Sequence, residues 1–116
     1  MRHLNKVKKL DRSASQRKAL LKSLTGSLID AEKIITTKAK GRALAPHVER
    51  LITRAKKKDL AAERYLLRFI PALFVKKLIS EIAPRYASRN GGYTRLTKIG
   101  RRQHDKAELV VVELLK

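Results

Sequence analysis

The stretch "KIITTK" at residues 33–38 places four β-branched residues in a row between two segments that follow a helical period. β-Branched side chains favour extended backbone, so a short strand is predicted here. Two more β-rich segments, "YTRLTKI" (93–99) and "ELVVVELL" (108–115), flank the loop "GRRQHDKA" and predict an antiparallel hairpin with a basic tip. Because an isolated hairpin is only marginally stable in water, we expect the early strand to join it in one small, mostly antiparallel sheet.

The segment before the early strand predicts a helix that begins after Ser13. Ser13 is a favourable N-cap, and Gln16, three residues later, completes a capping-box pattern. Gly26 is an expected weak point inside this helix. Apolar residues recur three and four positions apart and predict a buried stripe, with Ile29 at its margin, that consists of Leu20, Leu21, Leu24 and Leu28.

Three more helices are predicted before the hairpin. Thr37 is a candidate cap for the first, and Pro46 inside it predicts a kink or a late start. Asp59 is a candidate cap for the second, and the third follows Pro71 and is expected to stop before Pro84. Their inward residues are predicted to be Leu44, Val48, Leu51, Ile52 and Ala55, then Leu60, Leu67 and Tyr65, then Phe74, Val75, Leu78, Ile79 and Ile82.

The predicted fold class is α+β: a helix, a strand, three helices and two strands, with the helices packed on one face of the sheet. Residues 12–116 are expected to form this single domain, preceded by a flexible basic N-terminal arm at residues 1–11. Leu4, Val7 and Leu10 are too few, among so many charges, to hold the arm in a helix.

Positive charge dominates the composition, with 29 lysines and arginines against 10 acidic residues and a formal net charge of +19. The charge lies in three blocks, at residues 1–22, 33–58 and 85–106, and each block contains a single acid. Residues 59–84, between the last two blocks, are rich in large apolar side chains and are interpreted as core scaffold. An excess of this size repels itself and opposes the compact state, so we expect an anionic partner.

Nucleic acid is favoured over a membrane as that partner. Aromatic residues are only 4% of the chain, and the longest apolar run, "FIPALFV" at 69–75, contains a proline and falls short of the ~20 residues of a spanning helix. No apolar segment follows the basic start "MRHLNKVKKL", so a secretory signal is not expected. The absence of cysteine excludes disulfides and thiolate metal sites.

Catalysis is not expected either. His3, His47 and His104 have no metal-ligand spacing to one another. The "RNGG" run at 89–92 does not open a helix, as phosphate-binding loops do. The prediction is a protein that is not an enzyme and has no cofactor, no metal and no small-molecule substrate.

Three separated basic blocks predict phosphate and shape recognition on several surfaces, which a folded RNA suits better than a smooth duplex. Some of these residues have simpler explanations: the lysines at 56–58 also complement a helix dipole, and core packing is favoured over base stacking for Tyr86 and Tyr93. The candidate RNA-binding residues are Arg2, His3, Lys6, Lys8, Lys9, Arg12, Arg17, Lys18, Lys22, Lys38, Lys40, Arg42, Arg89, Tyr93, Arg95, Arg101 and Arg102.

The stretch "RYASRNGGYTRLTKIGRR" (85–102) holds five arginines, one lysine and no acid. Its glycine pair at 91–92 is expected to shape a tight entry into the strand that begins at Tyr93, since glycine adopts positive φ without strain. That entry would hold Arg89 and Arg95 towards phosphates on either side of the turn, while Tyr93 braces the strand from its inner side. Arginine suits this task because its planar fork grips a phosphate with two hydrogen bonds.

The segments "MRH", "KKLDRSASQRKAL", "KIITTKAKGRALAPHVERLITRAKK", "EIAPRYASRNGGYTR" and "VVVELL" occur in an order and spacing that resembles the bacterial large-subunit ribosomal protein L17 family along nearly the whole chain. The departures are Asp11 and Gln16, where the family usually has Asn and His, and Ala43 and Ala45, where it usually has Glu and Arg. The positions that match the family are Arg2, His3, Arg12, Arg17, Thr36, Thr37, Lys40, Gly91, Gly92, Tyr93, Thr94 and Arg95.

This resemblance implies a non-enzymatic, rRNA-binding structural constituent of the bacterial large ribosomal subunit, in the cytoplasm. It implies a position on the solvent side near the peptide exit tunnel, in contact with large-subunit rRNA and neighbouring large-subunit ribosomal proteins. The residues leave two other interpretations open, a DNA-binding architectural protein and a free RNA chaperone. A membrane-active protein is disfavoured by the missing signal and aromatic face.

Overall fold

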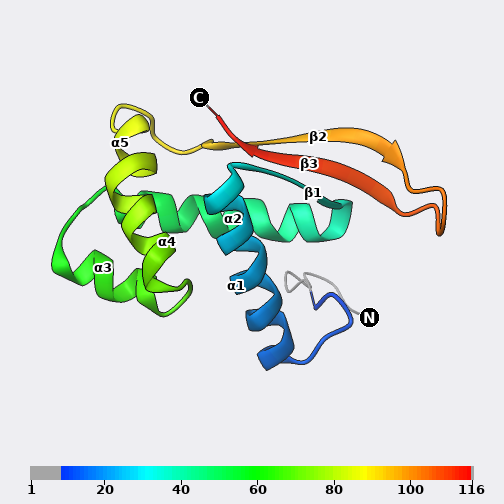
Figure 1. The fold of residues 1–116 in the computed structure, drawn as a ribbon, viewed down its shortest axis with the longest axis horizontal. Coiled ribbons are helices and arrows are strands. Elements are labelled where there is room, and N and C mark those ends of the chain that lie inside the picture. Colours follow the sequence, from blue (N-terminus) through cyan, green and yellow to red (C-terminus); the bar gives the residue numbers. More distant parts are fainter. Residues whose placement is uncertain (1–8, 116) are drawn as a thin grey trace, which may run out of the picture.

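The computed structural model describes residues 9–115. The predicted α+β class and the order of helices and strands are confirmed, and the helices lie against one face of the sheet (Figure 1). Most of the predicted arm at 1–11 lies outside the described residues. The elements are α1 (Ala14–Ala31), β1 (Lys33–Thr37), α2 (Lys38–Ala55), α3 (Leu60–Leu67), α4 (Ala72–Lys77), the π-helical turn η1 (Leu78–Ile82), α5 (Ala83–Arg85), β2 (Thr94–Arg101) and β3 (Glu108–Leu114).

The sheet has the order β1-β3-β2, and both strand pairs are antiparallel. The strand predicted from "KIITTK" therefore joins the hairpin as expected. Val112 of the central strand pairs with Ile34 on one side and Leu96 on the other, and it is fully buried. A bulge interrupts β2 between Lys98 and Gly100. Beyond the bulge the hairpin continues past the start of α2, so its tip has no helix beneath it (Figure 1).

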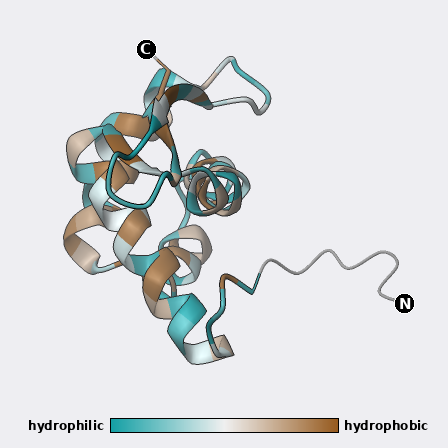
Figure 2. Cartoon of the chain, turned by 90° about the vertical axis from the view of Figure 1, so that its right-hand side faces the viewer, coloured by the Kyte–Doolittle hydropathy of each residue, from teal (hydrophilic) through white to brown (hydrophobic). Residues whose placement is uncertain are grey.

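Helix α1 begins at the predicted capping box. The Gln16 N–H donates to the Ser13 hydroxyl at 3.4 Å, and the Ser13 N–H donates to the Gln16 side chain at 3.1 Å. The predicted stripe is only partly right, because Ile29 is fully buried while Leu20, Leu21 and Leu24 are half-buried. The first half of α1 extends away from the sheet and is coloured mainly hydrophilic at its start (Figure 2).

Gly26, the glycine inside α1, is a packing position. A Cβ there would lie 3.0 Å from the Phe74 ring of α4, so the missing side chain lets the two helices meet. Gly41 has the same function in α2, where a Cβ would lie 2.7 Å from Val110 of the sheet.

Helix α2 runs without interruption from Lys38, so the late start predicted from Pro46 is not observed. Pro46 is exposed, and water can replace the backbone hydrogen bond that proline cannot donate. Thr37 occupies the cap position, but its side chain makes no capping hydrogen bond. The predicted inward face is confirmed by the burial of Leu44, Val48, Leu51, Ile52 and Ala55.

Helix α3 begins at the predicted cap, where the Ala62 N–H donates to the Asp59 carboxylate at 2.7 Å. Two of its predicted inward residues are wrong, since Leu60 is 61% exposed and Leu67 is 45% exposed, whereas Tyr65 is half-buried and packs against the core as predicted. Ala62 and Leu66 are buried instead. Small Ala62 permits close packing of α3 on α2, and this contact sets which side of the short helix faces inward.

The fourth predicted helix does not stop before Pro84. Helical backbone continues from α4 through η1 to Arg85. The Ala83 N–H donates to the carbonyl of Leu78, five residues back, which is the π-helical pattern. Pro84 then lies in the first turn of α5, where a missing N–H is tolerated. The buried residues of this segment include Val75, Leu78 and Ile82, as predicted.

Candidate nucleic-acid interface

The basic candidates fall into three groups on the structure. The chain leading into α1, the start of α2 and the tip of the β2–β3 hairpin lie towards the same end of the molecule (Figure 1). The exposed face of α1 forms a second group, and the turn before β2 forms a third. Four further candidates lie outside the described residues: Arg2, His3, Lys6 and Lys8.

The chain enters α1 through a turn that two arginines hold together. Leu10 and Asp11 have positive φ angles of 55° and 53°. The Arg12 guanidinium donates to the Leu10 carbonyl at 2.8 Å, and the Arg17 guanidinium donates to the Arg12 carbonyl at 3.1 Å. Each guanidinium has five N–H donors, so donors remain for an anion after these contacts are made. Lys9 at the start of this turn is exposed.

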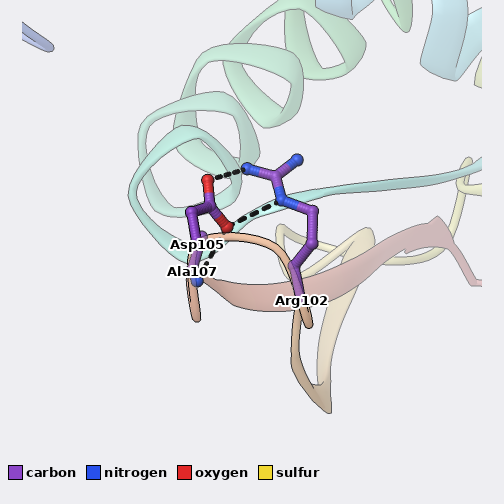
Figure 3. A network of polar contacts seen from close by, with 3 residues as sticks. All are labelled: Arg102, Asp105 and Ala107. Carbon is purple, nitrogen blue, oxygen red and sulfur yellow. Dashed lines mark hydrogen bonds and ion pairs between the residues drawn. The ribbon is translucent and has the colours of Figure 1, made fainter.

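The hairpin tip is closed by an arginine–carboxylate pair (Figure 3). Arg102 donates from Nε to Asp105 at 3.0 Å and from a terminal nitrogen at 2.9 Å. The same carboxylate accepts from the Ala107 N–H at 3.1 Å. The hydrogen bonds from Arg102 and from the Ala107 N–H hold the pKa of Asp105 below its usual value. Arg102 therefore shapes the tip at the same time as it supplies charge.

Two more hairpin arginines lie near acids. Glu108 is 3.2 Å from Lys38 of α2 and 3.8 Å from Arg101, and the hydrogen bond from Lys38 lowers the pKa of this carboxylate. Arg95 is 3.6 Å from Glu113 across the strand pair. At the start of α2, Lys40 is half-buried and Arg42 is exposed.

The turn before β2 has the predicted glycine geometry, with φ angles of +88° at Gly91 and +64° at Gly92. The Arg89 guanidinium donates to the Gly92 carbonyl at 3.3 Å. Lys56 Nζ donates to the Arg89 carbonyl at 2.6 Å and to the Tyr93 hydroxyl at 3.1 Å. Lys56 thus has a structural role, and the turn that carries Arg89 is fixed to the end of α2.

Tyr93 is only 1% exposed, and its ring centroid lies 4.9 Å from that of Tyr86. Leu115, which follows β3, joins this pair of tyrosines. The Leu115 N–H donates to the Tyr93 carbonyl at 2.9 Å, and the Tyr86 hydroxyl donates to the Leu115 carbonyl. The core role of both tyrosines is therefore confirmed. A buried ring has no face for a base, so we assign Tyr93 a bracing role within the candidate interface.

Lys18 and Lys22 stand one turn apart on the exposed face of α1. Among residues 9–115 neither lysine forms an ion pair with an acid. They line a hollow with Arg68 and the half-buried rings of His47 and Phe69. Burial, with a smaller contribution from the Arg50 charge, lowers the pKa of His47, so this imidazole is neutral at pH 7.

Sequence reasoning missed His47, Arg68 and Phe69 as members of a site. His47 had no metal-ligand partner, and the other two lie in the stretch interpreted as core scaffold. No local spacing signals the hollow, because its walls come from α1, α2 and the α3–α4 connection. In the described part of the chain, no group of three histidine or acidic side chains could hold a metal ion. Within the same residues, no helix combines the length and apolar character needed to cross a bilayer.

Comparison with known proteins identifies relatives over the whole fold. The family model described as ribosomal protein L17 matches residues 20–115. The large ribosomal subunit protein bL17 of Petrotoga mobilis is 50% identical, over 99% of this chain and 97% of its own length. The bL17 protein of Hydrogenobaculum is also 50% identical, with 99% of both chains covered, and that of Fusobacterium nucleatum is 46% identical over 99% of this chain and its own full length.

Proposed function

The chain belongs to the ribosomal protein L17 family, and we propose that it is a non-enzymatic structural constituent of the bacterial large ribosomal subunit that binds large-subunit rRNA. Its place is then the cytoplasmic ribosome, beside neighbouring large-subunit proteins. Binding uses phosphate and shape contacts from several basic surfaces rather than base reading in a groove. The names of the relatives support a place in the large ribosomal subunit. The choice of RNA-binding residues is our own proposal.

One observation carries the RNA-binding part of this proposal. The chain has a formal charge of +19, and within the described residues every lysine and arginine is exposed or half-buried, including those of the α1 face, the α2 start, the turn at 89–92 and the hairpin. Such an excess of positive charge repels itself and opposes folding in a protein that acts alone. A polyanion that contacts several faces at once accounts for it, and a folded RNA has this geometry.

We also propose that residues 1–11 act as an RNA-binding arm and that residues 12–116 form the domain. Arg2, Lys6, Lys8 and Lys9 give the arm four positive charges. Removing residues 1–11 should weaken rRNA binding while the melting temperature stays nearly unchanged. A large fall in melting temperature would contradict this division.

The test of the function is a binding titration of the full chain with large-subunit rRNA at several salt concentrations. If phosphate neutralisation dominates, log affinity falls linearly with log salt, with a slope of about −0.7 to −0.9 per phosphate contacted. Duplex DNA and unrelated structured RNA serve as competitors. A nearly flat salt dependence would refute the electrostatic mechanism, and equal affinity for duplex DNA would favour an architectural DNA-binding protein.

A further inference from the structure

The hollow between α1, α2 and the α3–α4 connection has a volume of about 380 Å³. Leu21 and Phe69 supply apolar surface inside it, and His47 contributes a neutral ring. Its charged lining residues are Lys18, Lys22 and Arg68, and no acid lines it. A hollow lined by apolar and aromatic side chains together with three cations is not a feature that folding requires. We refer to these six residues as the basic hollow.

The aromatic surface of the basic hollow is held firmly. The Phe69 ring meets His47 edge-on, with centroids 5.6 Å apart and planes at 76°. The Phe69 ring also contacts the Tyr65 ring, with centroids 5.0 Å apart. Tyr65 in turn lies under the Arg54 guanidinium, 4.3 Å from its ring centroid. A ring fixed in this way can stack on a ligand with little further loss of side-chain entropy.

We propose that the basic hollow binds one unstacked nucleobase of the large-subunit rRNA, with the base against Phe69 and the flanking phosphates on Lys18, Lys22 and Arg68. This inference rests on the proposed function. Unstacked bases in RNA loops and bulges are commonly held by aromatic side chains, while cations follow the backbone. The two chemical requirements, an aromatic surface and positive charge, are met together in the lining of this one hollow.

The charge decides between RNA and an apolar segment of a partner protein. A leucine-rich segment could fill the hollow, but it would take the three lining cations out of water without supplying counter-charges, which is unfavourable. A nucleotide supplies an aromatic face for stacking and an anion in one unit. We therefore commit to RNA as the occupant, and an apolar protein segment is an outcome of the test below.

The chain offers a matched pair for that test, since its two phenylalanines, Phe69 and Phe74, are both half-buried and only Phe69 lines the basic hollow. Phe69→Leu is expected to lower affinity for protein-free large-subunit rRNA about fivefold or more, because base–aromatic stacking is lost. The salt slope should not change, because no phosphate contact is removed. Phe74→Leu makes the same chemical change elsewhere and should leave affinity within about twofold of wild type.

Chemical probing of the rRNA bases supplies a direct readout. One base should be protected by the wild-type chain and by Phe74→Leu, and reactive again with Phe69→Leu. If Phe69→Leu lowers the melting temperature into the binding range, Arg68→Gln replaces it, with the expected loss of protection at the same base and a salt slope shallower by about 0.7.

The outcomes separate the two proposals. Normal rRNA binding and an unchanged base pattern with Phe69→Leu would overturn the base-binding role and leave the proposed function standing. Normal binding to free rRNA with loss of the variant from assembled subunits would also overturn it, in favour of an apolar protein segment. Failure of the wild-type chain to bind rRNA would contradict both the base-binding role and the proposed function.

Discussion

The β2–β3 hairpin and the exposed face of α1 carry charge of the same sign in different ways. In the hairpin, Arg95, Arg101 and Arg102 each lie within 4 Å of an acid. On α1, Lys18 and Lys22 lie one turn apart with no acid paired to either within the described residues. The hairpin is therefore partly neutralised by its own carboxylates, whereas the α1 face is not.

This difference separates a folding role from a binding role. Exposed ion pairs add little to stability because water screens them, but in the hairpin they help to order a ribbon that extends past the helices. Like charges one helical turn apart instead destabilise a helix by about 0.2–0.5 kcal/mol. The α1 arrangement therefore lowers the stability of the free protein and becomes favourable only beside an anion. We expect the α1 face to contribute more to rRNA affinity per residue than the hairpin.

The largest effect we expect concerns how the hairpin is anchored to the core. Tyr93 is buried where β2 begins, and Tyr93→Ala should lower the free energy of unfolding by about 3–5 kcal/mol, as for other buried aromatic residues. The melting temperature should fall by about 10 °C or more. Tyr65→Ala is the control, since Tyr65 is half-buried and outside the sheet. Equal losses for the two variants would show that the hairpin has no special anchor at Tyr93.

The second effect compares the two regions directly. Replacing Lys18 and Lys22 together with glutamine should weaken rRNA binding about 25-fold at 0.1 M salt and reduce the salt slope by about 1.4, if each lysine contacts one phosphate. The matched double change of Arg101 and Arg102 to glutamine should have a smaller effect on both, because Glu108 and Asp105 already compete for these arginines. Equal effects would remove the distinction between the two regions.

A third, smaller effect is expected at the turn before β2. Arg89 and Arg95 are exposed, and each already has one contact within the chain. Changing both to glutamine should weaken rRNA binding about fivefold, reduce the salt slope by about 0.7 and leave the melting temperature nearly unchanged. The melting temperature decides the interpretation, because a large fall would mean that these arginines only stabilise the turn.

The sequence predicts the parts of the fold that local chemistry determines. The capping residues of α1 and α3, the extended "KIITT" segment and the positive φ at Gly91 and Gly92 all follow from short-range rules. The errors occur where packing between distant segments decides. Leu60 and Leu67 turn outward, and helical backbone continues through Pro84, which lies in the first turn of α5.

The same distinction applies to the candidate site. Composition identifies the excess charge, but not which arginines have acids beside them, because Arg95 meets Glu113 only through the strand register. The basic hollow joins Lys18, His47 and Phe69 from three separate segments. No pattern within one segment could have grouped them.

The smallest effect we expect is a gain of binding, and it tests whether the hairpin tip is neutralised or preorganised by its acid. Asp105→Asn removes the charge that faces Arg102, so the guanidinium becomes available to a phosphate. Asparagine can still accept the Ala107 N–H that Asp105 accepts now, which should preserve the shape of the loop. We expect rRNA affinity to rise about two- to threefold at low salt, with a steeper salt slope and little change in the melting temperature.

Glu63→Gln on α3 is the control for the general loss of one negative charge, because Glu63 is an exposed acid outside the hairpin and the basic hollow. A fall in affinity with Asp105→Asn alone would mean that the ion pair holds Arg102 in its binding orientation, and the hairpin would then resemble the α1 face in function despite its acids.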